Sequence, residues 1–214
     1  MPRGPIDLMS GSQVQTVEKF IRPHEGGIQK DDRRRLNGHR SAIVWFTGLP
    51  GSGKSTLAYS LEEKLFRRGI RTYVMDGDNV RAGLNKDLGF SAEDRQENIR
   101  RIGEVARLFV EAGMLVMTAF VSPYRKDRES VRNLVGKGEF IEVYVKCPAG
   151  VCEQRDVKGH YKMARQGIIR NFTGVDDPYE EPEHPEMVVE SARMTVEESV
   201  ESIIRFLEER NVIV

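Results

Sequence analysis

The chain has 214 residues, of which 39% are hydrophobic, and its 33 basic residues balance 33 acidic ones. This length and composition suit one compact domain with a core of its own. The neutral balance argues against general nucleic-acid binding and against a basic patch for membranes. No apolar stretch approaches the ~20 residues that span a bilayer, and residues 1–5 contain no apolar part of a secretory signal. Cys147 and Cys152 lack metal-ligand spacing, so we expect reduced thiols in a cytoplasmic protein.

Residues 1–40 form a polar N-terminal extension with scattered Pro and Gly. Within it, residues 30–38 are typical of a short helix, with Asp31 near its start and Gly38 just past its end. We expect the remaining residues, 41–214, to form the main domain. An apolar run at 42–46 predicts its first buried strand.

A phosphate-binding loop follows this strand directly. Residues 48–55 fit the pattern G-x-x-x-x-G-K-[ST], the P-loop, and from Thr56 onward the apolar residues have helical spacing. Backbone N–H groups of such a loop surround phosphate oxygens, Lys54 reaches the β- and γ-phosphates, and the Ser55 hydroxyl ligates Mg²⁺. The residues expected to hold ATP here are Gly48, Leu49, Pro50, Gly51, Ser52, Gly53, Lys54, Ser55 and Thr56.

Strands and helices alternate through the rest of the chain. Further strands are expected at 71–75, 114–120, 140–145 and 187–189, and helices at 91–112, 126–135, 151–155 and 196–209. Ser91 is suited to cap the first of these helices. The alternation predicts an α/β fold of the P-loop NTPase type, with a parallel sheet of about five strands and helices on both faces. The long charged segment 157–186 is interpreted as a lid over the site. A disordered surface loop is the alternative, but Ile168, Ile169 and Phe172 favour packing.

Ligands in such sheets bind beyond the carboxyl ends of the strands. The P-loop, the acids Asp76 and Asp78, and Ser122 each follow a predicted strand and should therefore converge. Because the strand before Ser122 ends without an acid, Asp76 and Asp78 are the candidates to polarise a substrate hydroxyl, to order a metal-bound water, or both. A simple turn is the alternative interpretation of this Asp-Gly-Asp sequence.

Several arginines are expected near the same edge of the sheet, because their forked donors suit phosphate or sulfate. They are Arg81, Arg95, Arg100, Arg101 and Arg125, of which some must be ordinary surface residues. Phe90, between a glycine and the predicted cap, suits either stacking on a purine or packing of the helix start. The residues alone leave these two roles of Phe90 open.

Taken together, these motifs resemble the adenylylsulfate kinase family over residues 30–206. The resemblance is carried by Leu36-Asn37-Gly38-His39, Trp45–Ser55, Asp76–Arg81, Leu88–Ser91, Asp94-Arg95, Glu97–Arg101, Phe120–Arg125, Lys158-Gly159, Tyr161-Lys162 and Phe172–Glu180. It implies transfer of the γ-phosphate of ATP to the 3′-hydroxyl of adenylyl sulfate, with Mg²⁺, in a homodimer.

The resemblance also assigns roles to single residues. It implies that Arg81, Arg95 and Asn98 bind the phosphosulfate and ribose, and that Phe90 and Phe172 enclose the adenine of adenylyl sulfate. Further, it places Arg155 at the ATP site and matches Ser122 to a serine proposed in the family as a phosphorylated intermediate. No general base is evident beside Ser122, which favours direct transfer instead.

The sequence departs from the family pattern at two places, with Pro50 where a Ser is common and Ala82 where a His is common. Two other functions compete with this interpretation. Another P-loop metabolite kinase, acting on gluconate or a nucleotide, would not need Phe90 and Phe172 together with these basic residues. A silent nucleotide-binding scaffold is expected to lack Lys54, Asp76 or Asp78, and all three are present.

Overall fold

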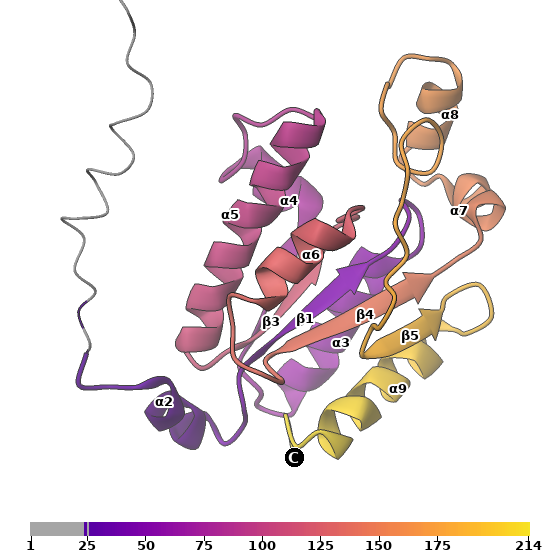
Figure 1. The fold of residues 1–214 in the computed structure, drawn as a ribbon. Coiled ribbons are helices and arrows are strands. Elements are labelled where there is room, and N and C mark those ends of the chain that lie inside the picture. The colour runs from indigo at the N-terminus through magenta and orange to yellow at the C-terminus, as the bar shows by residue number, and fades with distance from the viewer. Residues whose placement is uncertain (1–23, 25) are drawn as a thin grey trace, which may run out of the picture.

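The computed structural model describes residues 24 and 26–214, and their centre is a five-stranded parallel sheet (Figure 1). The strand order is β2-β3-β1-β4-β5. The strands are β1 (Ala42–Thr47), β2 (Thr72–Asp76), β3 (Leu115–Ala119), β4 (Phe140–Lys146) and β5 (Met187–Glu190). All four pairings between neighbouring strands are parallel. The predicted number of strands and their direction are confirmed.

Helices cover both faces of the sheet, as the alternation predicts (Figure 1). One face packs on α3 (Lys54–Arg67) and α9 (Val196–Glu209), and the other on α5 (Ala92–Glu111) and α6 (Arg125–Arg132). The side chains of β1 divide between two cores: Val44 and Phe46 join the first, whereas Ile43 and Trp45 join the second. Because successive side chains of a strand point to opposite faces, a buried central strand is apolar throughout.

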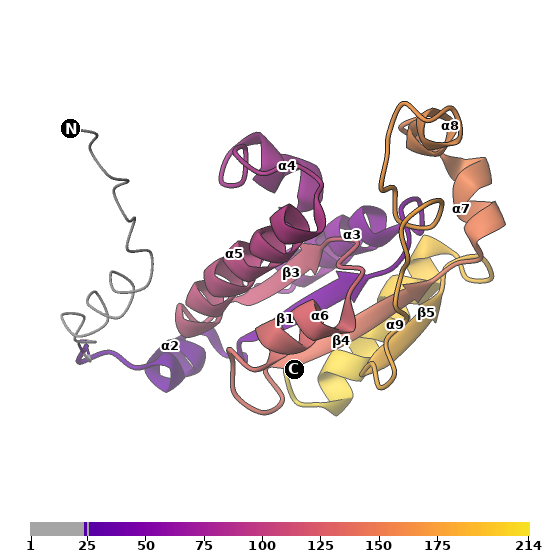
Figure 2. The same ribbon diagram turned by 45° about the horizontal axis from the view of Figure 1, so that its top comes forward.

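Two short helices were not expected from the sequence. The Asp-Gly-Asp segment does follow the predicted strand, but it is not the simple turn of the alternative interpretation, because it begins α4 (Gly77–Ala82). The predicted lid is not loop throughout, because it contains α8 (His160–Arg165). Figure 2 shows α4 and α8 beyond the end of the sheet toward which the arrows point. Helices of only six residues offer too little periodicity to be recognised in a charged sequence.

The other predicted boundaries are close to those observed. Ser91 caps α5 by accepting a hydrogen bond from the Asp94 N–H group, as predicted. The helix predicted over 126–135 is α6 and ends at Arg132, three residues earlier, and the helix predicted over 151–155 is α7 (Ala149–Arg155). No helix among the described residues is long and apolar enough to cross a membrane.

The predicted helix at 30–38 is present as α2 (Lys30–Asn37), and Gly38 ends it in the left-handed conformation. Most of the predicted N-terminal extension, residues 1–23 and 25, lies outside the described residues. The helix is anchored to the main domain by ion pairs from Lys30 and Arg34 to Glu139, just before β4. The bonds of these two cations hold the pKa of the buried Glu139 carboxyl below its ordinary value, although burial opposes the shift.

Candidate active site

The P-loop connects β1 to α3, and its glycines are required by close backbone contacts. Gly51 has φ +75°, and a Cβ there would lie 2.8 Å from the Cys152 carbonyl oxygen. A Cβ on Gly48 would lie 2.6 Å from the Val145 carbonyl oxygen. Side chains at these positions would therefore push the loop away from β4 and α7. Glycine at positions 48 and 51 is therefore required for the loop to lie this close to β4 and α7.

Lys54, the first residue of α3, is folded back onto the loop. Its Nζ donates hydrogen bonds to the carbonyl oxygens of Gly48, at 2.9 Å, and Leu49, at 2.8 Å. Burial lowers the pKa of the Lys54 ammonium to about 8, well under its ordinary value. A third bond goes to the Ser52 hydroxyl at 3.4 Å. A buried ammonium held by neutral oxygens is poised to exchange these partners for anionic phosphate oxygens.

Ser55 and Asp76 meet where the P-loop and β2 end. The Ser55 hydroxyl donates to the Asp76 carboxylate at 2.5 Å. The other Asp76 oxygen accepts from the Asp78 N–H group at 3.0 Å and so caps α4. Since β2, β3 and β1 are neighbours in the sheet, the three groups predicted after these strands do share one edge.

Asp78 faces a different partner from Asp76. Its carboxylate is two-thirds exposed and forms an ion pair with Lys158, which lies between α7 and α8. The two acids of the Asp-Gly-Asp sequence are therefore distinguished by their surroundings: one is joined to the P-loop serine and the other to the predicted lid. No local sequence pattern indicates this division.

Ser122 follows β3 and is only 2% exposed. Its hydroxyl accepts from the Trp45 indole N–H at 3.0 Å and lies 3.0 Å from the Thr47 hydroxyl. Its backbone is in the left-handed region, at φ +41°. No carboxylate or imidazole is hydrogen-bonded to this hydroxyl in the described part of the chain. The arrangement thus contains no base to activate Ser122 as a nucleophile.

The Ser122 turn is held by a buried arginine that the sequence analysis did not single out. Arg128, only 3% exposed, donates to the Ser122 carbonyl oxygen and to the Glu180 carbonyl oxygen, and pairs with Glu142 at 2.7 Å. It fixes β3, β4 and the end of the predicted lid relative to one another. A hydrophilic helix such as α6 gives no sequence signal for which of its arginines is buried.

Arg81, in the last turn of α4, lies beside Phe90, in the connection between α4 and α5. The Arg81 guanidinium donates to the Gly89 carbonyl oxygen at 2.9 Å and lies 4.4 Å from the centre of the Phe90 ring. Phe90 is 63% exposed, so it does not pack the start of α5. An exposed ring covered on one side by a guanidinium has the character of a stacking platform.

Arg95 connects this platform with the predicted lid. Its guanidinium donates to the Phe90 carbonyl oxygen at 3.0 Å and to the Thr173 hydroxyl at 2.6 Å, and it also bonds the Asn171 carbonyl oxygen. Asp177 lies 3.4 Å from it. Phe90 and the segment around Phe172 are thus linked through one side chain, although 82 positions separate the two rings in the sequence.

Phe172 packs on the helical part of the predicted lid. Its ring meets the buried Tyr161 edge-on, with ring centres 5.0 Å apart. The Tyr161 hydroxyl in turn donates to the Pro50 carbonyl oxygen of the P-loop at 3.0 Å. The expectation that the segment packs is confirmed for Phe172, but it is wrong for Ile168, which is 67% exposed.

The remaining predicted residues have separate settings. Asn98 is buried on α5 and accepts a hydrogen bond from the Asn85 amide at 2.9 Å. Arg155 reaches the P-loop indirectly: it donates to the Ser191 carbonyl oxygen at 2.7 Å, and the Ser191 hydroxyl donates to the Ser52 carbonyl oxygen. Three of the arginines expected at this edge bind surface acids instead, namely Arg100 and Arg101 on Glu97 and Arg125 on Glu183.

Some residues of this site were within recognised motifs but had no role assigned to them. They are Lys158, Tyr161 and Asp177, which pair respectively with Asp78, the P-loop and Arg95. The long charged segment that contains these three residues has no hydrophobic periodicity, so their contacts could not be predicted from the sequence. Only the folded chain brings them to the sheet edge.

The parallel sheet, the P-loop after β1 and the acid at the end of β2 define the class of protein: it has the fold of a P-loop kinase. A family model described as adenylylsulphate kinase matches residues 40–190. The chain belongs to the adenylylsulfate kinase family and is thus a phosphotransferase with an alcohol group as acceptor.

Individual relatives agree with this assignment. A probable adenylyl-sulfate kinase of Bacillus subtilis is 58% identical over 190 residues, which cover 89% of this chain and 96% of that protein. An adenylyl-sulfate kinase of Geotalea uraniireducens is 59% identical over 188 residues, covering 88% and 90%. Among solved structures, the Mycobacterium tuberculosis APS kinase in complex with AMPPNP and APS matches with a TM-score of 0.76 and 44% identity, covering 79% of this chain and 99% of that one.

Proposed function

We propose that this chain transfers the γ-phosphate of ATP to the 3′-hydroxyl of adenylyl sulfate through the residues at the carboxyl edge of β1, β2 and β3. The observation that carries the proposal is the 2.5 Å contact between Ser55 of the P-loop and Asp76 of β2, within a chain of this family. A serine at this place serves a nucleoside triphosphate, and an acid beside it serves the cation that accompanies the phosphates.

In this proposal the P-loop N–H groups bind the β- and γ-phosphates, and Lys54 turns from the carbonyl oxygens of Gly48 and Leu49 onto phosphate oxygens. The charge that Lys54 carries stabilises the transferred group as it leaves ADP. Arg155 supports the loop through Ser191 and Ser52. The 3′-hydroxyl attacks in line, and its proton is taken up at the Asp-Gly-Asp segment.

Ser55 and Asp76 fit the requirements of Mg²⁺. This ion keeps several waters and takes only one or two protein oxygens in addition to phosphate oxygens, and the pair supplies one hydroxyl and one carboxylate. When bound, Mg²⁺ neutralises charge on the β- and γ-phosphate oxygens. Asp76 keeps the serine hydroxyl oriented, while Asp78 orients the substrate hydroxyl from the side of Lys158.

Adenylyl sulfate is proposed to lie between the platform of Phe90 and the ring of Phe172, with its anionic groups toward Arg81 and Arg95. The exposed face of Phe90 and the position of Arg95 between the two segments support this arrangement. Asn98 is proposed to contribute from α5. The complex of the M. tuberculosis enzyme with APS supports the choice of acceptor.

Residues 157–186 are proposed to act as a lid, because Tyr161 bonds the Pro50 carbonyl oxygen of the P-loop and belongs to a cluster against which Leu49 packs. Closure of such a segment excludes water, which would otherwise accept the phosphoryl group.

Direct transfer without a phosphorylated Ser122 follows from the burial of that hydroxyl and from its neutral partners. We also propose a homodimer, to be tested by light scattering of the purified protein.

Three acceptors offered in parallel test the proposed function. ADP release is measured with ATP, Mg²⁺ and either adenylyl sulfate, gluconate or AMP at equal concentrations. We expect release with adenylyl sulfate alone, and identification of the product as phosphorylated at the 3′ position. Faster release with gluconate or AMP would replace this proposal by a different metabolite kinase, and no release with any acceptor would favour a silent nucleotide-binding protein.

A further inference from the structure

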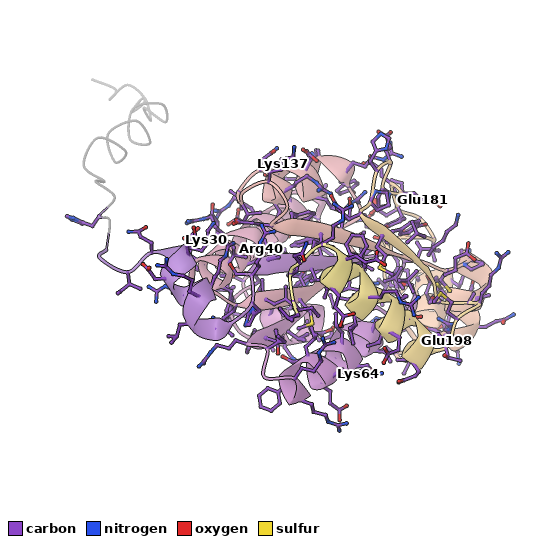
Figure 3. All side chains as sticks on the ribbon, turned by 90° about the horizontal axis from the view of Figure 1, so that it is seen from below. Lys30, Arg40, Lys64, Lys137, Glu181 and Glu198 are labelled. Atoms are coloured by element: carbon purple, nitrogen blue, oxygen red, sulfur yellow. The ribbon has the colours of Figure 1, made fainter. Side chains whose placement is uncertain are left out.

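A second, basic cleft lies at the opposite end of the sheet from the P-loop. It has a volume of about 610 Å³ and is formed where the loop before β1, the α6–β4 connection and the end of α9 meet. Arg40 and Lys137, from the first two of these segments, can be followed in the view from below in Figure 3. None of the residues proposed above for ATP or adenylyl sulfate lines this cleft.

The charge of the cleft is strongly unbalanced. Four lining side chains are cationic, namely Arg40, Arg132, Lys137 and Arg210, and only Glu186 is anionic. Glu186 is already occupied, because Arg132 binds it at 2.5 Å and 3.0 Å and its carboxylate also accepts the Glu142 N–H group. These bonds hold the pKa of the Glu186 carboxyl below its ordinary value, against the effect of burial.

Three of the cations have no carboxylate partner among the described residues: Arg40, Lys137 and Arg210. The neighbouring acid Glu139 cannot serve them, because Lys30 and Arg34 hold it. Surface arginines and lysines elsewhere on this chain repeatedly pair with acids, as Arg68, Arg165 and Arg193 do. Converging unpaired cations raise the local concentration of anions and bind phosphate or sulfate groups well.

The floor of the cleft is apolar. It is formed by Phe140, Ile141, Phe206 and Val212. The guanidinium of Arg132 lies 4.6 Å from the centre of the Phe140 ring, and that of Arg210 lies 5.1 Å from the centre of the Phe206 ring. A guanidinium spread over a ring presents its own flat face outward, and a planar base can stack on it. The volume also falls within the usual range for small-molecule sites.

We propose that this cleft is a second ligand site, which binds a small organic molecule carrying two or more phosphate or sulfate groups. The unpaired Arg40, Lys137 and Arg210 hold its anionic groups. The apolar floor, with guanidinium groups lying over its Phe140 and Phe206 rings, receives its organic part. The site is separate from the P-loop and does not depend on the function proposed above.

Binding is tested by NMR and by calorimetry on the full chain, with pyrophosphate and adenosine 3′,5′-bisphosphate as probes. Both probes are also expected at the P-loop, so the comparison is made between wild type and Lys137→Ala/Arg210→Ala. A double variant, Arg193→Ala/Arg205→Ala, removes the same charge outside the cleft and is the matched control. All four side chains are exposed or lie at the surface, and melting temperatures verify that each variant folds.

In the wild type we expect shifts of the amide signals of residues 136–138 and 210–212, and a bisphosphate stoichiometry of two per chain. Lys137→Ala/Arg210→Ala should weaken the second event at least about tenfold, the scale of losing charge-assisted hydrogen bonds, while the control and the kinase activity remain unchanged. Tighter binding of adenosine bisphosphate than of pyrophosphate supports a role for the apolar floor. Shifts confined to the P-loop, or equal binding by all variants, would overturn the proposal.

Discussion

The substitution Asp76→Asn should distinguish the roles of the two acids in the Asp-Gly-Asp segment. In the structure the Asp76 carboxylate accepts from the Ser55 hydroxyl, whereas the Asp78 carboxylate pairs with Lys158. The substitution keeps the shape and one acceptor oxygen but removes the negative charge. We expect kcat to fall about 10²-fold, the usual scale for losing a metal-shell acid or a general base.

The fold should survive this substitution. Asn caps a helix about as well as Asp, so the bond from the Asp78 N–H group that begins α4 is retained. Replacing one charge-assisted hydrogen bond by a neutral one costs about 1 kcal/mol, or a melting temperature lower by about 2–4 °C for a chain of this size. A loss of about 10² in rate corresponds to roughly 2.7 kcal/mol in the transition state, so lost stability does not account for it.

The assay is ADP release as a function of Mg²⁺ concentration, with Asp78→Asn as the matched variant. Asp76→Asn should need at least about tenfold more Mg²⁺ for half-maximal activity. Asp78→Asn should keep the wild-type Mg²⁺ midpoint and lose about tenfold in rate, because it weakens the exposed contact with Lys158 and the orientation of the substrate hydroxyl. The reasoning is refuted if Asp76→Asn keeps activity within threefold at limiting Mg²⁺, or if both variants shift the midpoint equally.

Other substitutions test the remaining roles. Lys54→Ala should lower kcat by about 10²–10⁴-fold. Because the pKa of Lys54 is lowered to about 8, kcat/KM for ATP in the wild type should fall as the pH rises through 8 and the ammonium loses its charge. A pH profile without that fall would contradict the role assigned to Lys54. Ser122→Ala should retain turnover within about tenfold but lose about 1–3 kcal/mol of stability, since the Trp45 indole loses its buried partner; a folded, dead enzyme or an acid-stable phosphoserine formed with ATP alone would restore the covalent route. Phe90→Leu and Phe172→Leu should each weaken adenylyl sulfate binding by about 1–3 kcal/mol with little change for ATP, and equal losses for both nucleotides in calorimetry would mean that the rings only support the fold.

The sequence alone determined the framework of this protein. The P-loop could be recognised because its chemistry needs glycine, lysine and serine at fixed spacing within a few residues. Buried strands such as 42–46 could be recognised because a parallel strand between two helical layers is apolar on both faces. Since parallel strands all end at one edge, the meeting of the P-loop, Asp76 and Ser122 could also be predicted without coordinates.

Only the tertiary structure decided which side chains act together. Asp76 and Asp78 have different surroundings because Asp76 binds Ser55, which precedes it in the sequence, whereas Asp78 binds Lys158, which follows it. The sequence also could not predict that Arg95 binds Thr173, or that Arg210 lies unpaired beside the cleft. Local sequence encodes periodicity, caps and short loops, because these depend on neighbours a few positions apart. Ion pairs and hydrogen bonds between residues tens of positions apart depend on the strand order and on which acid lies within reach of a long basic side chain. Neither of these produces a recognisable pattern among neighbouring residues in the sequence.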